Sequence, residues 1–142
     1  MKYLLDASAL LPLVIRRGKS LIVEASKEDL FTTDLAVYEA CNSLWKLTAL
    51  FKSISLEDAA VVATTLKDLA ARNLIQPTNY TSLNLSYTLK KAYEEELTFY
   101  DASYIAVAES IGATLVTEDE KLRKAASKSV TTLTYTDFEN RK

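Results

Sequence analysis

Histidine is absent from the 142 residues of this chain. Its absence excludes Ser-His-Asp and Cys-His catalytic triads, ribonuclease chemistry that relies on histidine, and ordinary zinc sites. Any metal site in this chain must therefore be rich in oxygen ligands. Such ligands favour Mg²⁺ or Mn²⁺ over softer cations.

Cysteine and long apolar runs are also scarce. Cys41 stands alone, so no disulfide can form within the chain, and its apolar neighbours predict a place in the core. No stretch approaches the roughly 18 uninterrupted apolar residues that span a bilayer. The N-terminal segment is interrupted by Asp6 and Pro12 and lacks a signal-peptide cleavage site. We expect a soluble, cytoplasmic protein without membrane contact.

Neither sign of charge is in large excess, because 17 Lys and Arg residues oppose 19 Asp and Glu residues. A net charge of −2 argues against a broadly basic face for nucleic acid, although a local basic rim is compatible with it. The composition is that of a globular protein, and the length is that of one domain. We find no repeat or linker and expect residues 1–142 to form a single domain.

Short apolar strands alternate with helices along the chain. We predict strands at residues 2–5, 29–32, 74–76, 114–116 and 130–134. We predict helices at residues 7–14, 19–26, 34–51, 56–72, 81–96, 99–110 and 118–126. This alternation predicts an α/β fold with a parallel sheet and helices on both faces.

Four acidic residues occupy the predicted ends of these elements. Asp6 and Asp119 each follow a strand, Asp101 lies in the first turn of a helix, and Glu39 lies in a second turn. Ligands of open α/β sheets bind outside the carboxyl ends of the strands, so the four side chains are expected to converge there. Converging carboxylates are suited to a hard divalent cation.

Each acidic residue also has a purely structural interpretation. Asp6 and Asp119 are placed to stabilise helix N-termini, and Asp101 follows Thr98 at the spacing of a capping box. Glu39 shares a polar helical face with three further residues, Asn42, Ser43 and Lys46. The metal-site interpretation therefore depends on all four residues lying at one edge.

Four motifs in this order resemble those of the PIN domain family, and together they cover nearly the whole chain. The segments LLDAS, EACNSL, YDASYIAVAE and LVTED contain, in turn, Asp6, Glu39, Asp101 and Asp119. The third motif is the most specific, whereas in the fourth Asp119 is flanked by Glu118 and Glu120. Size and motifs are similar to the VapC-type toxin ribonucleases. The resemblance implies a five-stranded parallel sheet, metal-dependent endoribonuclease activity on RNA, and an antitoxin partner.

Hydrolysis of a phosphodiester requires an activated water and neutralisation of charge on the leaving oxygen, which two Mg²⁺ ions can supply without histidine. We therefore assign the four acidic residues as catalytic metal ligands for Mg²⁺ or Mn²⁺. Ser8 and Thr117 are candidates to support these carboxylates through hydrogen bonds, or simply to cap helices. Possible contacts to RNA phosphates are Arg16, Arg17 and Lys19, for which a solvated loop is the alternative.

Sequence features bear on three alternative functions. A phosphatase of the haloacid dehalogenase type requires a second aspartate two residues after Asp6, where this chain has Ser8. A catalytically inactive PIN-like binding module and an RNA-processing PIN nuclease that is not a toxin both stay open. Target RNA, cleavage site, antitoxin identity and the number of metal ions are not encoded in any recognisable motif.

Apolar side chains exceed what one stripe of the predicted helices 34–51 and 56–72 can bury. The surplus consists of Tyr38, Trp45, Leu47 and Leu50. Exposed apolar surface of this kind is typical of interfaces, so we predict a homodimer.

Overall fold

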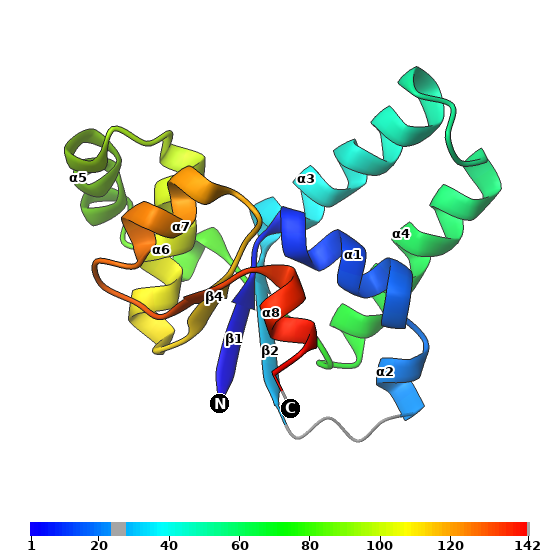
Figure 1. Ribbon diagram of the computed structural model, residues 1–142, viewed down its shortest axis with the longest axis horizontal. Helices are drawn as coiled ribbons and strands as arrows, with labels where there is room; N and C mark the ends of the chain where they lie inside the picture. Colours follow the sequence, from blue (N-terminus) through cyan, green and yellow to red (C-terminus); the bar gives the residue numbers. More distant parts are fainter. Residues whose placement is uncertain (24–27, 142) are drawn as a thin grey trace.

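The computed structural model describes residues 1–23 and 28–141, which form an α/β domain around one five-stranded sheet (Figure 1). The strands are β1 (Lys2–Leu5), β2 (Asp29–Thr33), β3 (Gln76–Thr78), β4 (Thr114–Val116) and β5 (Thr132–Leu133). Their order is β3-β2-β1-β4-β5, and every neighbouring pair is parallel. The predicted parallel α/β sheet is confirmed.

Two groups of helices cover the sheet (Figure 1). The helices are α1 (Ala7–Arg17), α2 (Ser20–Val23), α3 (Asp34–Trp45), α4 (Leu56–Ala71), α5 (Leu85–Glu95), α6 (Phe99–Ile111), α7 (Glu120–Ala126) and α8 (Tyr135–Glu139). Helices α1, α3 and α4 pack on one another, and α6 packs on both α5 and α7. A π-helical turn, Lys46–Leu50, prolongs α3 away from the sheet.

The core lies between the sheet and these helices. Leu4 and Leu5 of β1 are fully buried, as are Leu115 and Val116 of β4. Successive residues of a strand point to opposite faces, so burial of both members of each pair shows that both faces are covered. Helix α6 is buried continuously over residues 102–108, which explains why this part of its sequence carries no charge.

Helix N-caps account for where most helices begin. Thr33, Ser55 and Thr98 each accept a hydrogen bond from the backbone N–H three residues later, as their sequence positions predict. The prediction that a helix begins at Thr81 is wrong. A 3₁₀ turn spans Tyr80–Ser82, and α5 begins only after Asn84, whose side chain accepts from the Tyr87 N–H.

Two elements near strand ends also differ from expectation. Pro77 lies inside β3 rather than ending it, which is tolerated because β3 is an edge strand. Strand β5 is shorter than predicted and is followed by α8, which the pattern did not indicate. Thr134 caps α8 by accepting from the Asp137 N–H, and Phe138 fills the core.

Cys41 is exposed, so its predicted place in the core is wrong. Helix α3 buries the stripe formed by Ala36, Ala40 and Leu44, and Cys41 lies one position round from it.

Of the predicted helix 19–26, residues 20–23 are helical and residues 24–26 lie outside the described residues. Within the described ranges, no helix has the length and apolar character needed to cross a membrane.

Candidate active site

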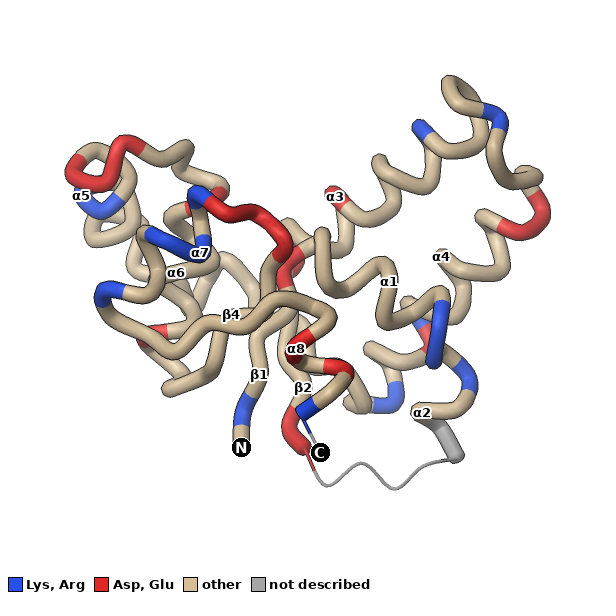
Figure 2. The backbone as a smooth tube through the Cα atoms, in the orientation of Figure 1, with Lys and Arg blue, Asp and Glu red and all other residues tan. Residues whose placement is uncertain are grey.

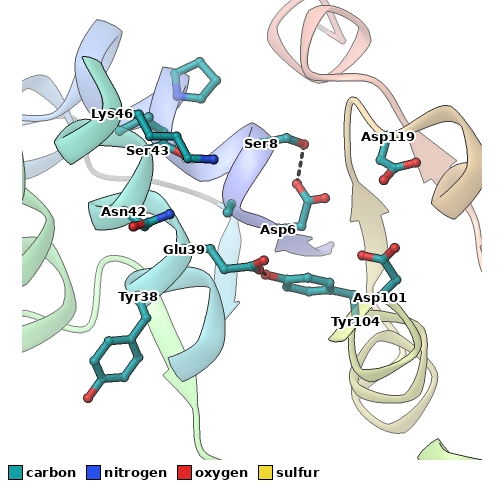
Figure 3. Close-up of a pocket in the computed structure, with 13 residues that line it drawn as sticks. Asp6, Ser8, Tyr38, Glu39, Asn42, Ser43, Lys46, Asp101, Tyr104 and Asp119 are labelled. Atoms are coloured by element: carbon teal, nitrogen blue, oxygen red, sulfur yellow. Dashed lines mark hydrogen bonds between the residues drawn. The ribbon is translucent and has the colours of Figure 1, made fainter. Parts of the chain in front are cut away.

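Asp6, Glu39, Asp101 and Asp119 line one cleft at the carboxyl ends of β1 and β4 (Figure 3). The cleft has a volume of about 590 Å³. Strands β1 and β4 are neighbours, but the helices that follow them, α1 and α7, belong to the two different helix groups (Figure 1). Open α/β sheets bind their ligands at such a divergence of connections. The predicted convergence is therefore observed.

Asp6 is the most buried of the four acidic residues, with 5% of its surface exposed. Its Oδ1 accepts from the Ser8 hydroxyl at 2.6 Å and from the Ala9 N–H at 3.1 Å. Its Oδ2 accepts from the Thr117 hydroxyl. The contact with Ala9 makes Asp6 the N-cap of α1, so one carboxylate both starts the helix and lines the cleft.

Ser8 and Thr117 are held so that their hydroxyl protons are directed at Asp6. Ser8 Oγ accepts from the Glu118 N–H at 2.9 Å, and Thr117 Oγ1 accepts from the Asp119 N–H at 3.0 Å. Each hydroxyl oxygen therefore accepts one hydrogen bond from a backbone N–H and donates one hydrogen bond to the carboxylate. This arrangement ties the loop between β4 and α7 to the start of α1.

The Asp6 carboxyl group experiences opposing influences. Burial raises its pKa above the ordinary aspartate value, and hydrogen bonds from Ser8, Thr117 and the backbone of Ala9 partly offset that rise. The net direction is upward. A buried carboxylate with a raised pKa gains stability from a nearby positive charge.

Glu39 and Tyr104 join α3 to α6 across the floor of the cleft (Figure 3). The Tyr104 hydroxyl donates to Glu39 Oε1 at 2.5 Å. Burial raises the pKa of Tyr104, and the Glu39 carboxylate raises it further, so the phenol keeps its proton and acts as a donor. Sequence reasoning missed this residue. Its position three residues after Asp101, on the same helical face, was the available signal.

Asp101 lies in the first turn of α6, and its side chain points into the cleft (Figure 3). Burial raises its pKa, and the neighbouring charges of Asp119 and then Glu39 raise it further. Hydrogen bonding with Thr98 and the charge of Lys121 act in the opposite direction. Asp119 and Glu39 are therefore close enough to Asp101 to influence it electrostatically.

Asp119 is distinguished from its acidic neighbours by its contacts. It caps α7 by accepting from the Leu122 N–H at 3.0 Å and also lines the cleft. The Glu118 carboxylate instead accepts from the Tyr135 N–H at 2.7 Å and thereby holds the start of α8. Neither Glu118 nor Glu120 lines the cleft, so the flanking acids do not compete for the same position.

One polar face of α3 completes the cleft wall. It consists of Glu39, Asn42, Ser43 and Lys46 (Figure 3). The sequence placed these residues on one helical face, and a solvated surface was the alternative to a metal site that includes Glu39. Lys46 is the cation among the lining residues, and its ammonium group is suited to a phosphate oxygen.

Arg16, Arg17 and Lys19, the predicted RNA contacts, do not line the cleft. The two arginines end α1, and Arg16 is ten positions after Asp6 along the helix, a rise of about 15 Å. Figure 2 shows basic segments at the C-terminal end of α1, remote from the acidic segment that leads into α7. Their contact with RNA stays a prediction, and it concerns RNA that extends beyond the cleft.

Comparison with known proteins identifies the family to which this chain belongs. The family model described as PIN domain matches residues 3–128. The chain belongs to the PIN domain family. This result confirms the resemblance carried by the four acidic motifs.

Relatives of this PIN domain come from Pyrobaculum aerophilum. A protein named Exonuclease VapC9 is 38% identical over 122 residues, covering 86% of this chain and 84% of that protein. A protein named Ribonuclease VapC3 is 33% identical over 126 residues, covering 86% and 92%. The solved structure of PAE2754 from the same organism superposes with a TM-score of 0.72 at 32% identity, covering 99% and 94%.

A more distant structure shares the fold. VapBC-1 from nontypeable Haemophilus influenzae superposes with a TM-score of 0.59 at 15% identity, covering 96% of this chain and 99% of that one. At this identity the similarity concerns the fold alone.

The donor set of the PIN cleft fits a divalent cation in chemistry. Four carboxylates and the Asn42 amide offer oxygen atoms, which Mg²⁺ and Mn²⁺ prefer. In residues 1–23 and 28–141, however, no three acidic or cysteine side chains lie close enough together to form a ready ligand cluster. Mg²⁺ usually keeps several waters and uses one or two carboxylates, so the wider spacing suits a hydrated ion.

Proposed function

We propose that this PIN domain is a metal-dependent endoribonuclease and the toxin of a toxin–antitoxin pair. The observation that carries the proposal is the meeting of Asp6, Glu39, Asp101 and Asp119 in one cleft. These residues come from four separate parts of the chain, and like charges are not gathered in this way for stability alone. The names of the relatives VapC9 and VapC3 support a nuclease of the VapC type.

Asp6, Glu39, Asp101 and Asp119 would hold Mg²⁺ or Mn²⁺, directly or through water. When bound, such ions lower the pKa of an attacking water and neutralise charge on the leaving oxygen. This chemistry requires no histidine, in agreement with the composition of the chain.

The remaining residues of the cleft position these groups. Ser8 and Thr117 fix both oxygens of Asp6, so the carboxylate does not need to reorganise during the reaction. Tyr104 holds Glu39 in one orientation. Lys46 lies on the same face of α3 as Glu39, where it would bind a phosphate oxygen of the RNA and help to align the scissile bond.

An antitoxin partner and a homodimer are further parts of the proposal, with a cytoplasmic location for the pair. Support comes from the exposed apolar side chains on and between α3 and α4, which include Tyr38, Trp45, Leu50, Phe51, Leu56 and Val61. A monomer gains nothing from exposing them together. Sedimentation at micromolar concentration tests the dimer, and a purely monomeric distribution would contradict it.

The nuclease assay should use a circular single-stranded RNA beside a linear RNA of the same sequence. With Mg²⁺ or Mn²⁺ we expect both to be cut, and EDTA should stop the reaction. Asp101→Asn should lower the rate at least about 100-fold, because it removes ligand charge. Asp137→Asn, an exposed change on α8, is the matched control and should keep full activity.

One relative's name favours a second candidate, an exonuclease. Cleavage of the linear RNA with survival of the circular RNA would establish that alternative. Absence of any metal-dependent cleavage would instead favour an inactive PIN-like binding module. A toxin differs from an RNA-processing nuclease in cells, because expression of a toxin should arrest growth, whereas Asp101→Asn should not.

A further inference from the structure

A second and smaller cavity lies at the same edge of the sheet as the carboxylate cleft. It has a volume of about 170 Å³ and is bounded by the ends of β2 and β3, the 3₁₀ turn, and the first turns of α3 and α6. In the strand order, β2 lies directly beside β1, whose end carries Asp6. Neighbouring strands are about 4.8 Å apart, so the cavity at the ends of β2 and β3 lies two strand spacings, about 10 Å, from the cleft at the ends of β1 and β4. We call it the tyrosine cavity, after Tyr80 and Tyr100.

The tyrosine cavity and the cleft share their walls. On α6, Asp101 and Tyr104 line the cleft, while Tyr100 and Ser103, each one residue earlier, line the cavity. Thr33 also lines the cavity and lies within hydrogen-bonding reach of the Tyr104 hydroxyl. Tyr104 and its neighbours on α6 therefore lie between the cleft and the tyrosine cavity.

Helix α3 contributes to both hollows in the same way. Asp34 and Leu35 line the tyrosine cavity, and Tyr38 and Glu39, one turn later, line the cleft. Only one turn of α3 therefore separates the residues that line the tyrosine cavity from those that line the cleft.

The lining of the tyrosine cavity combines aromatic side chains, among them Tyr80, Phe99 and Tyr100, with aliphatic ones such as Leu35 and Val107. Tyr80 and Tyr100 are 62% and 60% exposed, so their rings are accessible at its rim. No lysine or arginine within residues 1–23 and 28–141 lines it. Its acidic residue, Asp34, accepts from the Leu35 N–H at 2.9 Å and from the Tyr80 N–H at 3.2 Å, so both carboxylate oxygens already have partners.

We propose that the tyrosine cavity binds one nucleobase of the RNA, from a nucleotide next to the bond that is cut in the cleft. This inference rests on the proposed nuclease function. Single-stranded RNA is recognised chiefly through bases that stack on aromatic side chains, and such stacking does not require a charged partner. The cavity is smaller than the roughly 300–1,000 Å³ pockets of drug-sized ligands, which suits one planar ring system rather than a chain segment.

The proposal assigns different parts of the RNA to the cleft and to the tyrosine cavity. The cleft would bind the phosphate through Lys46 and through a divalent cation held by its carboxylates, and the tyrosine cavity would hold a neighbouring base. Binding of that base would fix the register of the chain, so Tyr80 and Tyr100 would determine which bond is presented for cleavage.

Equilibrium binding tests the proposal without catalysis. The probe is a short single-stranded RNA with 2-aminopurine at successive positions, titrated in Mg²⁺ against protein that carries Asp101→Asn to prevent cleavage. At one position, stacking on tyrosine should quench the fluorescence. Tyr80→Ala and Tyr100→Ala should each weaken binding about 10-fold and abolish the quenching. The corresponding Phe variants should keep both properties, because the ring is retained.

Matched controls distinguish the loss of base stacking from the loss of the protein fold. Tyr93→Ala removes a tyrosine that is 87% exposed on α5 and outside the cavity, and it should change nothing. Tyr100→Leu keeps apolar volume without an aromatic ring and should behave like the alanine variant. Circular dichroism of each variant shows whether the fold is retained.

A series of RNAs with one abasic nucleotide provides an independent readout. One abasic position should weaken binding to the tyrosine-containing protein about 10-fold and should add nothing to the loss in Tyr80→Ala with Tyr100→Ala. The same abasic penalty in both proteins would overturn the base site. Unchanged RNA affinity with lost binding of a protein partner would also overturn it.

The two proposals can fail separately. Normal RNA cleavage with unchanged affinity in both alanine variants would overturn the base site and leave the nuclease intact. Tyrosine-dependent quenching without hydrolysis by the protein that keeps Asp101 would support the base site and overturn the nuclease.

Discussion

Tyr104 of α6 donates a hydrogen bond to Glu39 of α3 at 2.5 Å, and this contact links the two helix groups beneath the cleft. Tyr104 is almost fully buried, with 2% of its surface exposed. The phenol therefore serves both the packing of α6 and the orientation of a carboxylate of the candidate site.

Tyr104→Phe should lower the cleavage rate about 10-fold while leaving the ring in place. It should also reduce the free energy of unfolding by about 1–2 kcal/mol, because Glu39 loses a buried donor. Steady-state kinetics and urea denaturation measure the two effects. Tyr135→Phe is the control, because Tyr135 donates to Glu139 away from the cleft. It should affect stability only, and an equal loss of rate in both variants would contradict a positioning role for Tyr104.

Asp119 and Glu118 are adjacent in sequence but serve different elements. Asp119→Asn should reduce cleavage with little change in melting temperature, because asparagine still caps α7. Glu118→Gln should leave cleavage nearly intact, since its side chain holds the Tyr135 N–H outside the cleft. Melting curves and rates for both variants check the assignment. A larger loss of rate in Glu118→Gln than in Asp119→Asn would reverse it.

Stability without metal should depend on pH through Asp6. Its folded-state pKa is raised by burial, whereas an unfolded aspartate titrates near 3.9. The favourable contribution is thus fully present below about pH 3.9 and is lost as pH rises through the folded-state pKa. Asp6→Asn should remove this loss and keep the N-cap of α1. Melting temperatures in EDTA from pH 3.5 to 7.5 should show the variant gaining on the parent protein as pH rises, whereas Asp137→Asn should follow the parent protein.

Mg²⁺ or Mn²⁺ should stabilise the protein at neutral pH. At 100 times Kd, binding to the folded state alone adds about 2.7 kcal/mol to the free energy of unfolding. The gain should shrink near pH 4, where carboxyl groups such as Asp101 bind protons instead. Thermal melts with EDTA and with Mn²⁺ measure this gain, and Asp6→Asn should abolish it. A metal response that survives Asp6→Asn would show that the carboxylates do not form one site.

Local sequence patterns determined the elements that depend on neighbouring residues. Thr98 and Gly112 mark the beginning and end of α6 because an N-cap oxygen and a left-handed C-cap act within one turn. Alternation of strands and helices was sufficient for the parallel sheet, and the places of Asp6 and Asp119 just after strands were sufficient for the edge at which they meet. The start of α5 was missed because Thr81 and Asn84 are both suitable N-cap residues, three positions apart, and the sequence alone does not rank them.

Tertiary structure decided which polar residues belong to the cleft. The sequence does not show which of the basic residues Arg16 and Lys46 lies at the cleft. Arg16 is at the far end of α1, whereas Lys46, just after α3, lines the cleft. Tyr104 acquires its partner from a residue 65 positions earlier, and Thr117 reaches Asp6 across 111 positions. Such contacts depend on the order of the strands and on how the helices pack over them. Short-range patterns determine the elements, and the sites arise from long-range packing, which brings together side chains that no local pattern relates.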